Sequence, residues 1–524
     1  MSADHDTGCV LARALAGPAC YPHAVDRVVR LETHISWIFL TGRYAYKIKK
    51  PVDFGFLDFT TLDARRRCCE DEVRLNRRLA PALYLDVVPI CGTSGSPRVG
   101  GNGPAIEYAV RMCEFPQHAL ASRLLDAGGL TAPLVGDLAR RIAAFHASLP
   151  PPPAESRYGS PEAVLRDAQE NFTAVRALLE TLGKAHDAPA ADALREWTER
   201  EFPAVRDRLR VRAGSSVREC HGDLHLGNIV LIDGKLVPFD CVEFNAALRW
   251  IDVMNEVAFM VMDLLDRGAD ALAWLFLDEY LEASGDYAGV AVVRFYLVYR
   301  AMVRAKVHLL RASQCTDVAE RRRLLEEYRS YVKLAQRCTR IGRAGIVLMH
   351  GYSGCGKTTV ARDIVRAIGG IRVRSDVERK RLHGLPALQP SGSAVGGGLY
   401  TRTVSEAVYS RLLDCAAAIA GAGYTAVVDA TFLARAERAR FSGVARGIGV
   451  PAIVIDVQAP RSVLDARVGS RRADASEATS QVLERQIATA EPIEAAEGLP
   501  VVHVDGCAPL TLPGSAELLG HLQR

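Results

Sequence analysis

The sequence contains no long apolar run, no paired-cysteine motif and almost no excess of charge of either sign. Its most apolar stretch, residues 246–265, is interrupted by several charged side chains, and we therefore expect no transmembrane helix. The 13 cysteines show no CxxC spacing, which favours reduced thiols over a disulfide framework or a zinc site. The first ten residues lack the basic and apolar segments of a signal peptide. These absences predict a cytoplasmic protein with no membrane partner.

The near-neutral charge narrows the classes of function. The 65 Lys and Arg residues almost balance the 61 Asp and Glu residues, so the formal net charge is +4 over 524 residues. A nucleic-acid coat protein is normally more basic, and nucleic acid is therefore not a favoured partner, although a local basic patch stays open. With 49% hydrophobic residues, the chain has the composition of a globular protein, and its length predicts two or three domains.

Hydrophobic periodicity predicts a small strand-rich lobe, a larger helical lobe and a separate α/β domain. In the last of these, strands alternate with helices, which indicates a parallel sheet with crossover helices. Within the small lobe, the glycine-rich residues 92–104 are expected to form a loop between two strands. The predicted boundaries are 1–29 for an N-terminal segment, 30–115 for the small lobe, 116–337 for the large lobe, 338–344 for a linker and 345–524 for the α/β domain.

A phosphate-binding loop follows the first strand of the α/β domain. Residues 351–358 read GYSGCGKT and fit GxxxxGK[ST], between an apolar strand and a helical segment. Glycines let backbone N–H groups point at phosphate oxygens, and the helix N-terminus favours negative charge. Lys357 is expected to reach the β- and γ-phosphates and to act in catalysis, while Thr358 places its hydroxyl on Mg²⁺. The predicted nucleotide-binding residues are Gly351, Ser353, Gly354, Cys355, Gly356, Lys357, Thr358 and Thr359.

Carboxylates end the next two strands of this domain. Asp376 lies where open α/β sheets bind ligands, and it could accept the proton of an acceptor hydroxyl while Arg379 holds the substrate. Asp429 is a candidate Mg²⁺ ligand of the Walker B type. For each aspartate the alternative is a helix N-cap.

A charged helical run farther along the chain contains three arginines, Arg467, Arg471 and Arg472. Such a run could be a lid that closes positive charge over the transferring phosphoryl group, or it could be a solvated helix face. We assign the catalytic role to Arg471, although its two neighbours compete for it.

A second constellation suited to phosphoryl transfer occupies residues 221–240. The segment HGDLHLGN is followed by a predicted hairpin that turns at Asp233-Gly234, and Asp240 comes after the hairpin. Asp223 would orient and deprotonate an acceptor hydroxyl, while Asn228 and Asp240 would hold Mg²⁺ on the nucleotide phosphates. The pattern is that of kinases in which HRDxxxxN precedes DFG.

This segment resembles the aminoglycoside phosphotransferase family and its choline kinase-type relatives, whose loop reads HGDxxxxN. The resemblance covers residues 30–330 and implies an α+β fold of two lobes, like that of protein kinases. One departure is that no GxGxxG precedes the expected nucleotide-binding lysine, so other backbone contacts must hold the nucleotide. The hinge that faces adenine should lie near residues 111–115.

The same resemblance implies a small-lobe lysine that binds the α- and β-phosphates and pairs with a helix glutamate. Lys47 and Lys49 lie on the same face of one predicted strand, and Lys47 is the preferred residue. Glu72 is its expected partner, with Glu70 as the rival. Each of these side chains could instead be a solvated surface charge.

The C-terminal motifs resemble small-molecule P-loop kinases related to gluconate kinase, zeta toxins and polynucleotide 5′-kinases. The likeness is carried by Gly351–Thr358, SDVERKR and VVDATF, and it covers residues 345–510. It implies ATP with Mg²⁺, an aspartate near the acceptor at Asp376, and lid arginines. The order of the two domains resembles bacterial proteins labelled bifunctional aminoglycoside phosphotransferase/ATP-binding protein.

Together these motifs predict an ATP-dependent kinase with two sites. Each site would transfer the γ-phosphoryl group of ATP to a hydroxyl of a small molecule, such as a sugar or an aminoglycoside, with ATP and Mg²⁺ as cofactors. Two alternatives stay open. The C-terminal domain could phosphorylate a polynucleotide 5′-hydroxyl, or one domain could be a non-catalytic module that senses nucleotide and regulates the other.

Overall fold

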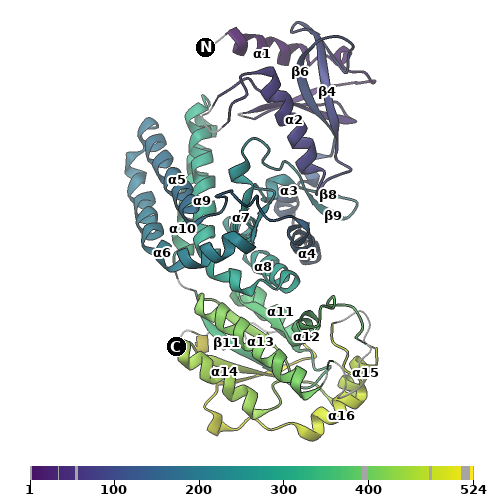
Figure 1. Cartoon of the computed structure of the whole chain (residues 1–524), viewed down its shortest axis with the longest axis vertical. Helices are drawn as coiled ribbons and strands as arrows, with labels where there is room; N and C mark the ends of the chain where they lie inside the picture. Colours follow the sequence, from purple (N-terminus) through teal and green to yellow (C-terminus); the bar gives the residue numbers. More distant parts are fainter. Residues whose placement is uncertain are drawn as a thin grey trace.

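The computed structural model describes residues 3–33, 35–53, 57–340, 342–391, 399, 401–470, 475–508 and 520–522. Two lobes of α+β structure are followed by an α/β domain, and the three parts are arranged along the long axis of the molecule (Figure 1). This is the predicted fold class. Among the described residues, none of the helices has both the length and the apolar character needed to cross a membrane.

The small lobe is an antiparallel sheet in the order β1-β2-β3-β6-β4-β5. Because side chains alternate along a strand, Trp37 and Phe39 pack on one face against α1, while Ala45 and Tyr84 pack on the other against α2. The elements are α1 (Ala3–Ala14), β1 (Val29–Glu32), β2 (Ser36–Leu40), β3 (Tyr44–Lys49), α2 (Leu62–Asn76), β4 (Tyr84–Thr93), β5 (Ser96–Val99) and β6 (Ala105–Cys113).

The prediction of a plain loop at residues 92–104 was wrong. Strand β5 lies within this range and pairs with Ile90–Thr93 of β4 across the tight turn at Ser94-Gly95. The polar, glycine-rich composition conceals the strand, because Val99 is the apolar residue that anchors it in the core, at 4% exposure. The two-residue turn uses only Gly95; Gly92 lies in β4, and Gly100, Gly101 and Gly103 fall after β5.

The large lobe is helical, with two short two-stranded sheets. The hairpin of β8 (Ile229–Ile232) and β9 (Lys235–Pro238) turns at Asp233-Gly234, where both residues have positive φ, as predicted for that dipeptide. The second sheet pairs β7 (Val217–Glu219) with β10 (Trp250–Asp252). The helices are α3 (Ala121–Asp126), α4 (Ala132–Ser148), α5 (Pro161–Thr181), α6 (Ala188–Ser215), α7 (Val253–Asp266), α8 (Asp270–Ser284), α9 (Val290–Gln314) and α10 (Val318–Cys338).

The C-terminal domain is a parallel sheet in the order β12-β13-β11-β14-β15, with helices on both faces. Strand β15 goes beyond the four strands that the sequence pattern predicts; it is an edge strand on which His503 is exposed. The elements are β11 (Gly345–His350), α11 (Lys357–Ile368), β12 (Ile371–Arg374), α12 (Ser375–Leu382), α13 (Arg402–Gly421), β13 (Thr425–Asp429), α14 (Arg435–Ile448), β14 (Ala452–Gln458), α15 (Arg461–Ser470), α16 (Ser480–Thr489) and β15 (Val501–Asp505).

Helix α8 joins the large lobe to the α/β domain, and it lies above α11 at the waist of the molecule (Figure 1). Arg372 of β12 is fully buried there, and its guanidinium lies 2.6 Å from Glu282 Oε2 and 3.3 Å from Asp278 Oδ2. The Arg372 backbone N–H also donates to Asp278 Oδ1 at 2.6 Å. One apolar core runs through this junction without a break, from Val257 of α7 to Ile371 of β12.

The carboxylates around Arg372 differ in their protonation. Burial raises the pKa of Asp278 to about 7, with the neighbouring Glu282 adding to the rise, although Arg372 opposes both effects. Burial acts on Glu282 as well, but Arg372 and Arg374 hold its pKa below the usual range. Glu282 is therefore the closest ionised partner of the buried Arg372 charge, and Glu279 Oε1 lies farther from the same guanidinium, at 3.7 Å.

We expect Glu282→Gln to destabilise the junction by about 3–5 kcal/mol, because Arg372 then stays buried without its closest ionised partner and keeps only the more distant Glu279. Asp278→Asn keeps the side-chain oxygen that accepts the Arg372 N–H, and it should change stability by less than about 1 kcal/mol. Calorimetric unfolding of the full-length chain measures both variants. Equal losses from the two substitutions would contradict the assignment of charge.

The raised pKa of Asp278 also predicts a dependence of stability on pH. The folded protein holds this proton up to about pH 7, whereas the unfolded chain releases it near 3.8. Folding therefore binds a proton between these values, and the contribution of Asp278 to stability falls as pH rises toward 7. We expect Asp278→Asn to lose stability less steeply than the natural chain from about pH 5 to about pH 7. Parallel stability profiles would contradict this expectation.

Candidate active sites

The predicted catalytic loop brings Asp223 and Asn228 together. Asn228 Nδ2 donates to Asp223 Oδ2 at 2.8 Å, and His225 Nε2 lies 3.4 Å from the same oxygen. Among the described residues, none donates a hydrogen bond to Asp223 Oδ1, and the side chain is 36% exposed. Burial raises the pKa of Asp223, but His225 and Arg304 outweigh it and hold the pKa well below its usual range. The loop thus presents an ionised carboxylate oxygen to an approaching group.

A buried glutamate that the motifs do not reveal holds this loop from behind. Glu256 of α7 accepts the backbone N–H of His221 at 3.1 Å and that of Gly222 at 2.6 Å. Its Oε1 also lies 3.0 Å from Nε2 of His146 on α4. Burial raises the pKa of Glu256, but the hydrogen bond with His146, the charges of His146 and His221 and the Gly222 N–H together outweigh it and lower the pKa to about 2. Glu256 therefore stays charged and fixes the backbone on which Asp223 stands.

Lys47 and Lys49 both contact Glu72, which lies on α2 and is fully buried. Lys47 Nζ is 2.9 Å from Glu72 Oε1, and Lys49 Nζ is 2.5 Å from Glu72 Oε2. Lys47 also pairs with Asp240, and Lys49 pairs with Glu243. Burial lowers the pKa of each lysine, but the surrounding carboxylates outweigh it and the pKa is raised. The rival glutamate, Glu70, is half-exposed and pairs with Arg66 instead.

A cleft of about 200 Å³ lies between the lobes beside Lys47, Asn228 and Asp240. Its apolar walls include Ile38, Ala45, Met112 and Phe239, which is the lining that a planar base requires. The predicted hinge contributes Glu114 and Phe115 to the same cleft. In place of a glycine-rich motif, Gly42 donates its N–H to Glu114 Oε2 at 2.7 Å, so the β2–β3 turn is tied to the hinge.

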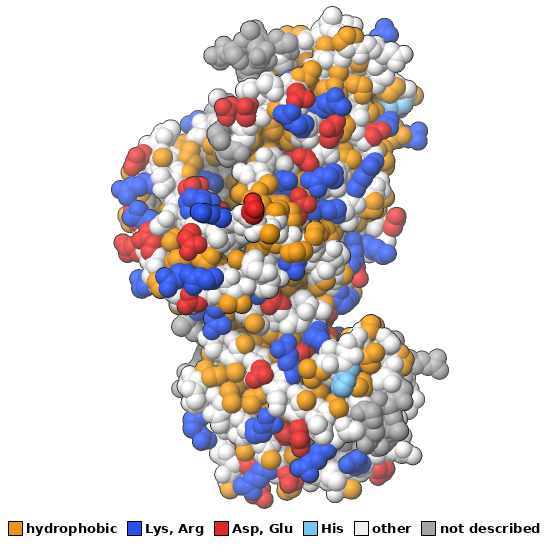
Figure 2. Space-filling view, viewed as in Figure 1, with side chains coloured by type: hydrophobic (Ala, Val, Ile, Leu, Met, Phe, Trp, Pro, Cys, Tyr) orange, Lys and Arg blue, Asp and Glu red, His pale blue; other side chains and the backbone are white. Residues whose placement is uncertain are grey.

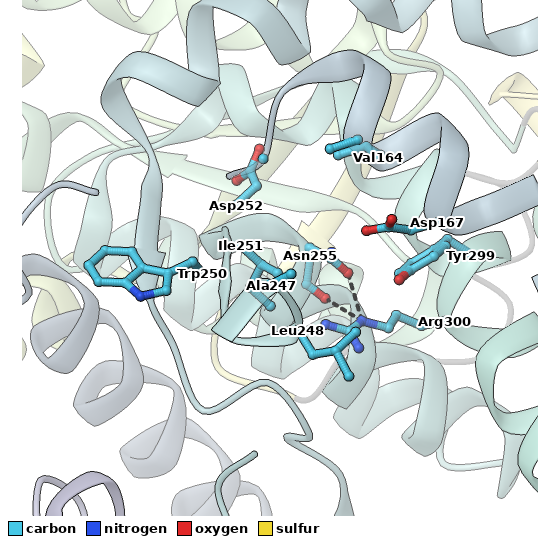
Figure 3. Close-up of a pocket in the computed structure, with 12 residues that line it drawn as sticks. Val164, Asp167, Ala247, Leu248, Trp250, Ile251, Asp252, Asn255, Tyr299 and Arg300 are labelled. Atoms are coloured by element: carbon cyan, nitrogen blue, oxygen red, sulfur yellow. Dashed lines mark hydrogen bonds between the residues drawn. The ribbon is translucent and has the colours of Figure 1, made fainter. Parts of the chain in front are cut away.

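Helix α9 supports the catalytic loop through Arg300, which lines a narrow pocket together with Asn255 (Figure 3). Arg300 Nε donates to Asn255 Oδ1 at 2.6 Å, and Arg300 Nη1 donates to Gly222 O at 3.2 Å. Asp252 of the same pocket is the N-cap of α7, where its Oδ1 accepts the Met254 N–H at 2.9 Å, and it is paired with Arg212. Both residues hold structure around the loop.

The phosphate-binding loop of the second site has its lysine folded inward. Lys357 Nζ donates to Gly351 O at 2.8 Å and to Tyr352 O at 2.7 Å, and it lies 3.6 Å from Cys355 Sγ. Cys355 is 1% exposed, so the thiol is shielded within the loop. Gln486 of α16 closes over the loop, since its Oε1 accepts the Ser353 N–H at 2.9 Å and its Nε2 donates to Ser353 Oγ at 3.0 Å.

A cavity of about 900 Å³ gathers the predicted residues of this site. Gly356, Lys357, Thr358 and Thr359 line it together with Asp376, Arg379, Asp429 and Arg467. Neither aspartate is a helix cap: α12 has Arg374 as its N-cap, and α14 has Ala434. Asp429 lies 3.7 Å from Arg374, which also reaches Glu282 of α8 at 3.4 Å.

The predicted lid is described in part. Arg467 Nη1 donates to Gly354 O at 3.2 Å and to Gly506 O at 3.0 Å, so this arginine joins the phosphate-binding loop to the loop after β15. Arg471, the predicted catalytic arginine, and Arg472 lie outside the described residues.

Both sites offer the oxygen ligands that Mg²⁺ prefers. Asn228 uses its amide nitrogen on Asp223, which leaves its carbonyl oxygen available. Asp240 has φ of 63°, a conformation that aspartate tolerates better than most residues, and its side chain is 40% exposed in the cleft. In the second site, Thr358 and Asp429 line one cavity. These residues would hold the ion, which when bound neutralises phosphate charge.

Motif spacing misses several residues that shape the two sites. Glu243 falls three positions after Asp240, and Glu256 and Asp263 interrupt the apolar helix α7. A charge inside a buried apolar helix signals a buried partner, and Asp263 Oδ2 indeed accepts the Leu226 N–H of the catalytic loop at 2.8 Å. Gln486, in contrast, leaves no such signal.

Comparisons with known proteins match two separate parts of the chain. Residues 61–296 match the profile of the phosphotransferase enzyme family, and residues 346–493 match that of an AAA domain. A protein of Mycobacterium tuberculosis (strain ATCC 25618 / H37Rv), described as uncharacterized, is 30% identical over 456 residues, which cover 86% of this chain and 88% of that protein.

Two solved structures illustrate the likeness of each part. A sugar kinase from Janibacter sp. HTCC2649 is 20% identical, covering 34% of this chain and 94% of that chain with a TM-score of 0.26. A choline kinase from Cryptosporidium parvum Iowa II is 11% identical, covering 59% of this chain and 89% of that chain with a TM-score of 0.38.

The family matches confirm the predicted order of domains and the predicted enzyme class. The chain belongs to the family of the mycobacterial protein that it matches over most of its length, and it is an ATP-dependent kinase in which a domain of the phosphotransferase enzyme family precedes a P-loop AAA domain.

Proposed function

We propose that the chain carries two phosphotransferase sites, one within residues 30–337 and one within residues 345–524, and that each transfers a γ-phosphoryl group from ATP to a hydroxyl of a small molecule. The observation that carries the proposal is that each cavity gathers the groups that would hold nucleotide phosphates and Mg²⁺, with an aspartate for the acceptor hydroxyl in or next to it; in the first site this is Asp223, which Asn228 contacts. The first has Lys47, Asn228 and Asp240 in one cleft. The second has Lys357, Thr358, Asp376 and Asp429 in one cavity.

In the first site, Asp223 accepts the hydrogen of the acceptor hydroxyl through its open Oδ1 and aligns the acceptor oxygen. As that oxygen bonds to the γ-phosphorus, the bond from phosphorus to the β,γ-bridging oxygen breaks, ADP leaves, and the proton passes to the carboxylate. The low pKa of Asp223 keeps the carboxylate charged before the reaction, so its main contribution is orientation. Lys47 is placed to bind the non-transferred phosphates.

In the second site, Lys357 releases the loop carbonyls that it now contacts and binds phosphate oxygens instead. Asp376 takes the role of Asp223, and Arg379 lines the same cavity, where it could hold the acceptor. Arg467 bridges two loops at the cavity edge, which keeps positive charge near the nucleotide.

Small acceptors suit this proposal better than polynucleotides. On the face shown in Figure 2, basic and acidic side chains are mixed over the two lobes and the α/β domain, and no continuous basic stripe crosses that face. A groove that tracks a nucleic-acid backbone would need such a stripe. A 5′-hydroxyl oligonucleotide is nevertheless included among the test acceptors below.

We expect Asp223→Asn to lower turnover at the first site by about 10²- to 10⁴-fold and to leave the second site unchanged. Lys357→Ala should have the reverse effect, because it removes the phosphate contact of the second site only. ADP release and mass spectrometry, with sugars, aminoglycosides and a 5′-hydroxyl oligonucleotide as acceptors, separate the two activities.

The exposed Asp126, paired with Arg123 on the surface, supplies the control Asp126→Asn, which should be silent. If Asp223→Asn changes no activity while Lys357→Ala abolishes all of it, the first domain is a nucleotide-sensing module and the two-site proposal fails.

We expect Lys47 to bind ATP and Lys49 to stabilise the fold. Lys47 lines the cleft, so Lys47→Met should weaken ATP binding by at least about 10-fold. It should cost less stability than Lys49→Met, because one of its two carboxylate partners, Asp240, is 40% exposed to water. Lys49 is fully buried, and Lys49→Met leaves Glu72 and Glu243 short of a cation, which should cost about 3–5 kcal/mol. Calorimetric ATP binding in a Lys357→Ala chain, together with thermal unfolding, measures both effects. The reverse pattern would assign phosphate binding to Lys49.

A further inference from the structure

Two arginines of α9, Arg300 and Arg304, lie one helical turn apart and contact the catalytic loop. They differ in how many of their N–H groups have a hydrogen-bond acceptor. Arg300 donates to Asn255 Oδ1, Asn255 O and Gly222 O, and it stacks over the ring of Phe259 at 4.6 Å. Arg300 is therefore fully engaged in holding the loop.

Arg304 has fewer acceptors than Arg300. The Tyr331 side chain hydrogen bonds to it, and the guanidinium carbon lies 5.9 Å from the centre of the Tyr331 ring. Among the described residues, no carboxylate oxygen lies within 4 Å of its guanidinium, and its Nε is buried without an acceptor. Its Nη1 lies 3.5 Å from His225 Nε2, and its Nη2 lies 3.5 Å from His308 Nε2. A guanidinium has five N–H groups, and leaving them unmatched in a partly buried place is costly.

The tautomer of His225 removes one possible acceptor of Arg304. The backbone N–H of Gly227 donates to His225 Nδ1 at 3.0 Å, so Nδ1 carries no hydrogen and Nε2 carries one. That Nε2–H points to Asp223 Oδ2, 3.4 Å away. Nε2 is thus a donor and cannot accept from Arg304. Two donors face each other there, and a group that accepts from Arg304 is missing.

His308 offers at most one weak contact. Its Nδ1 lies 2.7 Å from Glu327 Oε2, which leaves Nε2 as an acceptor at the 3.5 Å limit from Arg304 Nη2. Arg304 is thus a cation whose Nε has no acceptor and which, among the described residues, pairs with no carboxylate; Tyr331 and His308 are its neighbours. A single imidazole separates it from the proposed catalytic carboxylate.

We propose that Arg304 binds an anionic group of the phosphoryl acceptor at the first site. The acceptor would be a small hydroxylated molecule that carries a carboxylate or a phosphate a few bonds from the reacting hydroxyl. An anion accepts the charge-assisted hydrogen bonds that Arg304 lacks, while Asp223 takes the hydroxyl. A cationic acceptor such as an aminoglycoside would instead be repelled by the Arg304 charge. This inference rests on the proposed function of the first site.

The catalytic test uses the full-length chain with Lys357→Ala, which removes the second site. Matched acceptors vary only in charge: glycerol, D-glycerate, glycerol 3-phosphate and 3-aminopropane-1,2-diol, and the corresponding set of glucose, gluconate, glucose 6-phosphate and glucosamine. We expect one anionic member to exceed its neutral partner in kcat/KM by about 10- to 100-fold, as a charged hydrogen bond provides. The two anionic arms distinguish carboxylate from phosphate.

Arg304→Met should remove this preference by raising KM for the anionic acceptor, so that kcat/KM for the anionic acceptor falls to the value for the neutral one. Arg304→Lys should restore part of it. Arg311→Met is the matched control, because Arg311 lies two turns along the same helix, is half-exposed and has Glu320 at 3.8 Å. Equal use of neutral or cationic acceptors would overturn the proposal. An equal loss of kcat/KM for anionic and neutral acceptors would also overturn it, because Arg304 would then act on the catalytic loop or on the transferring phosphoryl group and not on the charge of the acceptor.

A second measurement does not depend on turnover. Crystals of the full-length chain with ADP and Mg²⁺ are soaked in selenate, and the anomalous signal of selenium locates the anion. Selenate in contact with the Arg304 guanidinium, absent in Arg304→Met, supports the proposal; selenate found only elsewhere is an adventitious ion and overturns it. If selenate binds at Arg304 but Asp223→Asn leaves phosphorylation unchanged, the proposed function of this site fails while the anion site stands.

Discussion

The ion pairs between Arg372 and helix α8 fix the two halves of the molecule against each other. Arg372 is fully buried, and a buried guanidinium is tolerated only where carboxylates surround it. Asp278 and Glu282 meet that need from the other half, and the apolar core continues through the same junction. The orientation of the α/β domain thus follows from electrostatics and packing together. A linker alone would leave the two halves free to rotate.

Helix α8 is also connected to both sites. On one side, the Tyr280 hydroxyl lies 2.9 Å from Nδ1 of His146, whose other ring nitrogen contacts Glu256 behind the catalytic loop. On the other side, Glu282 contacts Arg374, which in turn approaches Asp429. Helix α8 therefore contacts Glu256 of the first site through His146 and Asp429 of the second site through Arg374.

The sequence predicts the parts of these sites that are local. The phosphate-binding loop and the HGDxxxxN loop place their groups within a few residues, and both occur between the expected elements. Contacts between distant segments are different: Arg372 is separated by 90 residues or more from its partners on α8, and Glu256 by more than 100 from His146. Tertiary packing determines which of these distant residues pair, and motif spacing in the sequence carries no information about it. The charge inside apolar α7 does indicate that Glu256 has some buried partner.

The junction has a consequence for how the chain folds during synthesis. The ribosome completes α8 long before it reaches β12. Until β12 is made, the carboxylates of α8 and the apolar surface around Trp274 are exposed to water. Domains generally fold as units in the order of synthesis, but here the first unit cannot bury its last face until the sheet of the second has formed. The N-terminal kinase body should therefore remain incompletely folded, and open to chaperones, until nearly the whole protein has emerged.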